Sequence, residues 1–431
     1  MTSPSQVVRR AGDDPCQCCE EWLPGARDAR EALLCVRFDL PQVWLDGSPR
    51  QRLWALYLWR QGELSIAVGE VEPAIERDIP GIIFDTWVRR QRLFVAISGE
   101  ALPLGTRVID KPWGREVWYT GVEKRAVCSF ANDSGEVPQP WMLAALPGAE
   151  YTRAGEATLL LKILAPSAEA VAGDLYFELH SEKEEVYVVT HVEPAAWKDG
   201  VGYIRYGFDP GRVAQWGGEQ KFRRAYLAAV EAYRGVREAI DALPGNVPVP
   251  EGLRNREREM RTAMDAFTSL KPVRRGDVIH VPRLLPHALQ HGVRVVELQT
   301  PVYERKILSF AQRVLTQPHW DTAEAVAEME LFPPDEAPAT VLRDAEGGMA
   351  QRIAEADDFE LRRLQIAPGG RLSLTVEGPY ALLMVLEGAI EISGRRQGEG
   401  QAAWLPAAWQ AELVLAQAAP AVDLLLAIPR S

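Results

Sequence analysis

The chain has 431 residues, of which 47% are hydrophobic and 25% are charged, a composition ordinary for a soluble globular protein with two or three domains. Its net charge of −12 argues against general binding to nucleic acid, because phosphate neutralisation needs a basic surface. No apolar run approaches the ~20 residues of a membrane span, and the N-terminus lacks the apolar core of a signal peptide, so we expect a cytoplasmic protein without a membrane partner.

Residues 1–105 are interpreted as an N-terminal extension or accessory domain of unknown role. Residues 1–25 are polar, acidic and rich in Pro and Cys, and we expect them to be disordered. Cys16, Cys18 and Cys19 are crowded into C-Q-C-C, which leaves open a metal or redox site or incidental thiols in a mobile tail. Further along come the apolar runs LWALYLW, ELSIAV and RLFVAIS, and within the last two LSIAV and LFVAI are bounded by turn formers and predict strands.

Two later regions are also predicted to consist mainly of strands. Residues 106–214 and 271–328 contain short apolar runs such as EATLLLKIL, EVYVVTHV and GVRVVELQTP. After a linker rich in Pro and acidic residues at 329–340, residues 341–431 return to short strands separated by turns, as in a sandwich or barrel. Residues 341–431 contain no histidine, which excludes a histidine-ligated metal site there.

A helical insertion is predicted between these strands, at residues 215–270. Phe222, Leu227, Val230 and Tyr233 recur at helix-like intervals, with charged residues between them. A second charged helical run follows the breaker PGNVPVPEG. We interpret the charges as a solvated face.

The first candidate metal motif is F-E-L-H-S-E-K-E-E-V-Y-V-V. Side chains alternate across a strand, so Glu178 and His180 are expected to point to one face. Glu185 begins the next apolar run, as it would on the partner strand of a hairpin. These three side chains can therefore converge on one cation.

The second motif is G-D-V-I-H-V-P-R-L-L-P-H, in which five residues separate Gly276 from Pro282 and His287 comes five positions after Pro282. Together the two motifs resemble the signature of cupins, and they identify Glu178, His180, Glu185 and His287 as ligands of one divalent metal. Cupins usually have His or Gln at the position of Glu178, and Gly at that of Leu284. The other four histidines are assigned to the sheet or its turns: His191, His280, His291 and His319.

At residues 108–431 the sequence also resembles the type I phosphomannose isomerases, which are zinc-dependent bicupins. The resemblance rests on K-P-W-G from Lys111, on E-L-H-S-E-K where the family has Q-x-H-P-D-K, and on V-V-E-L-Q-T-P followed by Y-E-R-K. It implies a mainly β bicupin of two jelly-roll barrels: a metal-binding catalytic cupin at 106–214 and 271–328, and a degenerate second cupin at 341–431. It also implies the following roles: Glu297 and Arg305 catalytic, and Lys111, Trp113 and Lys183 substrate-binding.

The implied reaction interconverts mannose 6-phosphate and fructose 6-phosphate through an enediolate. Glu297 would transfer the proton or position a hydroxyl, and Arg305 would stabilise the enediolate or bind the phosphate with its planar donors. Lys183 and Lys111 are further candidates for binding the phosphate. The alternatives are that Lys183 is a solvated lysine at a strand end and that Lys111 is a turn lysine. The partner is thus a small sugar phosphate.

Glu178 is the departure with the largest consequence. Two carboxylates would bring a divalent site to zero net charge, which makes it a poorer electrophile than a site with one carboxylate and an amide. Oxygen-rich ligation favours harder ions, so manganese or iron stay open beside zinc, the expected metal. Two other functions also stay open: another metal-dependent cupin enzyme, such as an oxygenase, and a non-catalytic sugar-binding cupin.

Overall fold

The computed structural model describes residues 6–75, 79–147, 158–244, 247–311 and 320–430. Strands dominate, as predicted, with seven helices among these residues. The chain divides into two compact units, which are described separately. The first contains residues 1–107, 118–161 and 339–431, and the second contains residues 108–117 and 162–338.

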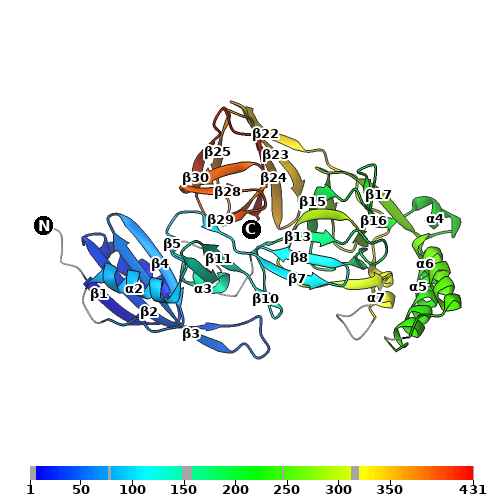
Figure 1. Cartoon of the computed structure of the whole chain (residues 1–431), viewed down its shortest axis with the longest axis horizontal. Coiled ribbons are helices and arrows are strands. Elements are labelled where there is room, and N and C mark those ends of the chain that lie inside the picture. Colours follow the sequence, from blue (N-terminus) through cyan, green and yellow to red (C-terminus); the bar gives the residue numbers. More distant parts are fainter. Residues whose placement is uncertain (1–5, 76–78, 148–157, 245–246, 312–319, 431) are drawn as a thin grey trace. The chain divides into compact units, whose positions relative to one another are not determined.

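The N-terminal part of the first unit is a five-stranded sheet of order β1-β2-β3-β4-β5. Its elements are β1 (Gln6–Ala11), α1 (Pro15–Ala26), β2 (Glu31–Pro41), β3 (Arg50–Arg60), β4 (Glu63–Gly69), α2 (Pro80–Gln91) and β5 (Ala96–Ile97). β1 and β2 are parallel and joined through α1, while the remaining pairs are antiparallel. The blue part of Figure 1 shows α2 lying across this sheet.

The prediction of disorder over residues 1–25 is wrong for the described residues 6–25. Asp14 caps the N-terminus of α1, where its side chain accepts from the Gln17 amide, and Pro15 stands in the first turn. Cys19 and Trp22, one turn apart, are buried. The polar composition of the segment concealed this apolar stripe. Helix α2 was also missed, although Ile83, Phe84 and Trp87 are spaced as on one helix face.

The rest of the first unit contains a seven-stranded sheet of order β22-β23-β24-β31-β26-β29-β6. Its strands are β6 (Leu102–Pro103), β22 (Thr340–Ala345), β23 (Gly348–Glu355), β24 (Phe359–Ile366), β26 (Tyr380–Glu387), β29 (Ala402–Pro406) and β31 (Val422–Pro429). Two ribbons accompany it: β25 (Arg371–Thr375) with β30 (Gln410–Val414), and β27 (Ala389–Ile392) with β28 (Arg395–Gly398). We call residues 339–431 the C-terminal barrel. Its core is a single cluster of aliphatic side chains with Trp409.

The first unit also contains a group of short elements within residues 118–161. They are β9 (Val122–Glu123), β10 (Ala126–Val127), β11 (Ser129–Asn132), β12 (Gly135–Pro138) and α3 (Gln139–Ala145). The Tyr57 hydroxyl of β3 donates to the carbonyl of Ala145 at the end of α3, at 2.8 Å. This buried hydrogen bond fastens α3 to the N-terminal sheet.

The second unit is built on two sheets with a common core. The six-stranded sheet has the order β18-β15-β20-β13-β8-β7, and the five-stranded sheet has the order β17-β16-β19-β14-β21. The strands are β7 (Arg107–Lys111), β8 (Gly114–Trp118), β13 (Leu160–Pro166), β14 (Phe177–Leu179), β15 (Glu185–Val192), β16 (Gly202–Phe208), β17 (Thr268–Val273), β18 (Val278–Val281), β19 (His287–Leu289), β20 (Val293–Gln299) and β21 (Lys306–Ser309). Val189 and Val295 from one sheet and Ile204 and Leu289 from the other share one core. We call this unit the metal barrel.

Helices α4 (Pro210–Gln215), α5 (Glu219–Asp241) and α6 (Glu251–Asp265) follow β16, and α7 (Thr322–Glu328) follows β21. The helical runs expected within 215–270 are therefore α5 and α6, drawn in green in Figure 1. Phe222, Tyr226, Val230 and Tyr233 line the buried side of α5 and share a second core with the outer face of the five-stranded sheet. Among the described residues, no helix is both long and apolar enough to span a membrane.

Candidate metal centre

Three of the predicted ligands meet at the ends of strands in the metal barrel. His180 directly follows β14, Glu185 is the first residue of β15, and His287 is the first residue of β19. All three side chains are buried, and their ligand atoms lie within 4.8 Å of one another. In the described part of the chain, this is the one group of three or more His, Cys, Asp or Glu side chains with the geometry to hold a metal ion.

The hydrogen bonds of the two imidazole rings leave one nitrogen of each ring for a metal. His180 Nδ1 lies 2.9 Å from the carbonyl oxygen of Glu304, and His287 Nδ1 lies 3.0 Å from that of Leu285. Because a carbonyl oxygen only accepts, each Nδ1 donates a proton, and Nε2 of each ring, which faces Glu185, is the nitrogen that a cation could bind. His180 Nε2 is buried and takes no hydrogen bond from a described residue. The two rings therefore fit a divalent cation.

Glu185 is the centre of the group. Its Oε1 lies 2.6 Å from Lys183 Nζ and 3.2 Å from His180 Nε2. Its Oε2 accepts from the Tyr187 hydroxyl at 2.6 Å and lies 3.2 Å from His287 Nε2. Burial alone would raise the pKa of this carboxyl, but Lys183 and the two histidines outweigh burial and hold the pKa well below its usual range. The Glu185 carboxyl is thus ionised at neutral pH.

The surroundings of the two histidines shift their pKa values in opposite directions. Burial and the charge of Lys183 lower the pKa of His180. Burial acts in the same direction on His287, but its hydrogen bond with Glu185 outweighs burial and raises the pKa. A cation at Nε2 of His287 competes with a proton for that nitrogen, so binding is expected to weaken as the pH falls.

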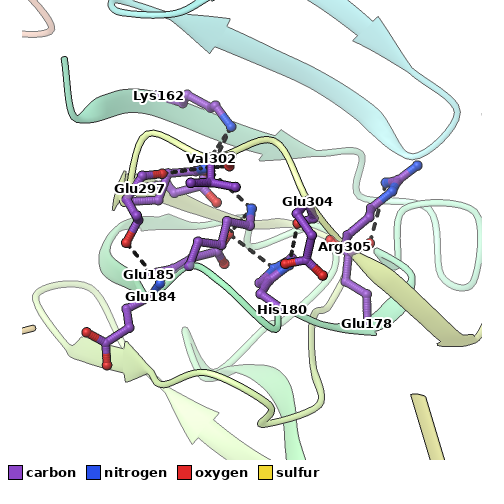
Figure 2. Close-up of polar contacts among 12 residues, drawn as sticks. Lys162, Glu178, His180, Glu184, Glu185, Glu297, Val302, Glu304 and Arg305 are labelled. Carbon is purple, nitrogen blue, oxygen red and sulfur yellow. Dashed lines mark hydrogen bonds and ion pairs between the residues drawn. The ribbon is translucent and has the colours of Figure 1, made fainter. Parts of the chain in front are cut away.

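The fourth predicted ligand, Glu178, lies outside this group. Its Oε2 is 3.4 Å from the Arg305 guanidinium, which also lies over the ring of Tyr176 with its central carbon 5.4 Å from the centroid. Figure 2 shows the contact between Glu178 and Arg305 on the far side of Glu304 from Glu185. The backbone nevertheless places Glu178 directly opposite His287 in the pairing of β14 with β19. Ligation by Glu178 stays a prediction.

A second buried polar cluster adjoins the ligands and contains Glu297. Lys162 Nζ on β13 lies 2.8 Å from Gln299 Oε1 and 3.4 Å from Glu297 Oε2 on β20. Gln299 Oε1 is also 3.4 Å from Lys183 Nζ, so the cluster continues to Glu185. Burial raises the pKa of Glu297 to about 7, against the opposing charge of Lys162. Glu297 is therefore poised to change protonation near neutral pH.

The remaining predicted site residues have other surroundings. Lys111 pairs with Glu116 at 3.0 Å between their side-chain ends. The Trp113 side chain is 4% exposed and belongs to the core of the metal barrel, so its contact with a substrate stays a prediction. His291 bonds to Asp174 at 2.7 Å, in a turn as expected, and His319 lies outside the described residues.

Four residues of the site were missed from the sequence: Lys162, Tyr187, Gln299 and Glu304. Lys162 had a signal, because a charged residue inside the apolar run LLLKIL is buried only when it is paired. Tyr187 stands two residues after Glu185 and so shares its face of β15. Gln299 pairs with Glu185 across β15 and β20, a register that the sequence did not reveal.

The second motif is explained by backbone conformation. Gly276 has φ +96°, a region that favours glycine, and its amide donates to the Val189 carbonyl at 2.8 Å. Leu284, where cupins usually have Gly, has φ +64°. Its amide donates to the carbonyl of His180 at 2.7 Å. This contact ties the two motifs together, and the positive φ at residue 284 accounts for the glycine that cupins usually have there.

Comparison with known proteins identifies the fold. No family model and no curated protein matches the sequence. Among solved structures, the mannose 6-phosphate isomerase of Bacillus subtilis is similar with a TM-score of 0.56 and 13% identity, covering 76% of this chain and 99% of that one. A zinc-bound mannose 6-phosphate isomerase has a TM-score of 0.53 at 13% identity over 76% and 99%. The apo form from Salmonella typhimurium gives 0.53 and 13% over 77% and 100%.

The chain therefore has the cupin-type fold of the phosphomannose isomerases, as the motifs predicted. At 13% sequence identity, this structural likeness shows the fold and does not show the activity.

Proposed function

We propose that this protein is a metal-dependent sugar-phosphate isomerase that interconverts mannose 6-phosphate and fructose 6-phosphate. The observation that carries the proposal is the buried group of His180, Glu185 and His287, in which both imidazoles present Nε2. The likeness in fold to mannose 6-phosphate isomerases, one of them zinc-bound, supports the same reaction. Zinc is the proposed metal, with manganese and iron as alternatives, and Glu178 completes the proposed ligands.

The reaction moves one proton between C1 and C2 of the sugar through an enediolate. A bound divalent cation supplies electrostatic stabilisation of negative charge on the sugar oxygens. The chain must therefore move the proton and hold the phosphate. Glu297 is the group proposed for the proton, because its carboxyl is buried and its pKa is raised to about 7.

Arg305 is the group proposed for the enediolate or the phosphate. Its planar guanidinium can bind two oxygens at once, and its side chain is 30% exposed, within reach of a ligand. Lys183 and Lys111 are further proposed cations. Lys183 is held by Glu185, so its charge is fixed beside the ligands, while Lys111 would have to leave Glu116 to contact a phosphate.

A coupled assay on mannose 6-phosphate, with the metal content of the same sample, tests this function. We expect turnover and about one metal per chain in the wild type, and loss of both in His287→Ala. His191→Ala is the matched control, because His191 is half-exposed and its contact is with Glu193. No turnover in metal-replete wild-type protein would refute the isomerase.

Glu178→Gln tests the electrostatic consequence of the second carboxylate. Removal of one negative charge restores a net positive divalent site and makes it a stronger electrophile. We expect the variant to isomerise mannose 6-phosphate faster than the wild type at saturating metal. A slower variant with full metal content would contradict this.

A metal-dependent oxygenase is the second candidate. The pairing of Glu178 with Arg305 leaves two histidines and one carboxylate, the ligand set of many non-haem iron oxygenases. Oxygen consumption by the ferrous protein, without isomerase turnover, would favour this candidate.

A further inference from the structure

Glu304 contacts three consecutive residues of the candidate metal centre. It lies between β20 and β21, and its carbonyl oxygen accepts from His180 Nδ1 at 2.9 Å. Its carboxylate oxygen Oε2 accepts from the backbone amides of Ser181, at 2.9 Å, and Glu182, at 3.3 Å. Figure 2 shows Glu304 beside His180 and Arg305. One residue therefore engages the histidine ring and the two amides that follow it.

These contacts fasten the turn that carries two of the three ligands. His180 begins the connection from β14 to β15, and Glu185 ends it. The amides of Ser181 and Glu182 at its start lie outside the strands, and the Glu304 carboxylate is the acceptor for both of them. At the other end, the Glu184 amide donates to Thr300 Oγ1, and the Thr300 amide donates to the Glu184 carbonyl, both at 3.1 Å. Residues 300–304 thus hold both ends of the turn.

The anchor depends on a particular departure of this sequence. Residue 181 is Ser, whereas the resembling motif Q-x-H-P-D-K has Pro at this position. Proline has no amide hydrogen, so it could not donate to the Glu304 carboxylate. In this sequence, the Glu304 carboxylate restricts the backbone of the turn through hydrogen bonds, whereas a proline at residue 181 would restrict it through its ring.

We propose that Glu304 is a positioning residue for the metal centre. Its carbonyl orients His180, and its carboxylate fixes the turn so that the spacing of His180 and Glu185 is set before a cation binds. The inference rests on the metal centre of the proposed function and is independent of the substrate.

Zinc affinity of the purified full-length protein, measured by competition with a chelator, tests the proposal. We expect Glu304→Ala to raise the zinc dissociation constant about tenfold or more, the usual effect of losing an outer partner of a ligand. Glu304→Gln retains an acceptor oxygen and should stay within a few-fold of the wild type. Glu182→Ala is the control, since it removes an exposed carboxylate of the same turn and leaves its anchor intact.

Hydrogen exchange in the metal-free protein gives a second readout. The peptide containing Ser181 and Glu182 should exchange faster in Glu304→Ala than in the wild type and Glu182→Ala. If Glu304→Ala does not fold, Glu304→Asp carries the test, because it keeps the charge but withdraws the oxygen by one methylene. The proposal would be overturned if Glu304→Ala and Glu304→Asp both bound zinc as tightly as the wild type. It would also be overturned if Glu182→Ala lost as much zinc affinity as Glu304→Ala. Absence of isomerase turnover would refute the proposed function and leave both readouts intact.

Discussion

The metal barrel and the C-terminal barrel differ most in what they bury. The C-terminal barrel has one core of aliphatic side chains with Trp409, and its buried polar residues among those described are Glu360 and Gln397. In the metal barrel, a lysine, two histidines and two glutamates lie fully buried beside the apolar core: Lys162, His180, Glu185, His287 and Glu297. Similar strand patterns therefore enclose very different interiors.

The difference is consistent with the proposed function, which places the chemistry in the metal barrel. Moving a charge out of water costs several kcal/mol unless it is paired, and even a paired charge seldom stabilises more than a hydrophobic side chain would. The network from Lys162 to Glu185 therefore has no advantage for folding alone. Under the proposed function, these charges serve the metal centre, and the C-terminal barrel contributes stability through its apolar core.

The largest expected effect comes from removing the charge at the centre of the metal barrel. Glu185→Gln leaves Lys183 buried without its carboxylate and takes the only anion from the three-residue group. We expect zinc affinity to fall by at least 100-fold, with isomerase turnover below detection. Chelator competition measures the zinc affinity, and the coupled assay measures the isomerase turnover.

Glu360→Gln is the matched change in the C-terminal barrel. Glu360 is also buried and charged, and it accepts from Arg362 and lies 3.4 Å from Arg430. We expect lower stability with unchanged zinc affinity. Equal zinc affinities for the two variants would remove the distinction between the barrels.

The reverse experiment removes apolar volume from the C-terminal barrel. Leu424 on β31 is fully buried in its core. Leu424→Ala should lower the free energy of unfolding by about 2–5 kcal/mol, because it creates a cavity. Urea unfolding measures this cost, and zinc affinity at 25 °C should stay that of the wild type. A large loss of zinc affinity in a folded variant would contradict separate roles.

The sequence predicted the part of the site that depends on local spacing. His180, Glu185 and His287 come together because strand alternation, a short turn and the second motif fix their places along the chain. The contacts of Glu178 could not be predicted in the same way. Its position on β14 lies near both the Arg305 guanidinium and the group of His180, Glu185 and His287, and strand alternation does not decide between them. Its pairing with Arg305 depends on tertiary structure.

The fold was predicted best where the apolar pattern was strong. The strands of both barrels and helices α5 and α6 were expected, while α1 was missed because its few buried residues stand among acidic and polar neighbours. Glu304 was missed for another reason. Its importance comes from contacts with residues more than 120 positions earlier in the chain, which no local pattern records.

A smaller effect tests the cluster around Glu297. Lys162 lowers the pKa of Glu297, so Lys162→Met should raise that pKa and keep the carboxyl protonated to higher pH. If the ionised carboxylate accepts the proton, the acid limb of kcat/KM should move to higher pH by about one unit or more. A pH profile on mannose 6-phosphate at constant metal content measures the shift. An unchanged limb, or movement to lower pH, would exclude Glu297 as the base.

The smallest expected effect is a change in stability at Leu284, where a glycine substitution distinguishes backbone strain from side-chain packing in the metal barrel. Leu284 has φ +64°, which costs a leucine about 1–2 kcal/mol, and its side chain is only partly buried. In Leu284→Gly, relief of that strain should offset the lost packing, so stability should stay within about 1 kcal/mol of the wild type. The neighbouring Leu285 is fully buried and has no such backbone, so Leu285→Gly should cost at least about 3 kcal/mol. Urea unfolding compares the two, and similar losses would show that the backbone at Leu284 is not strained.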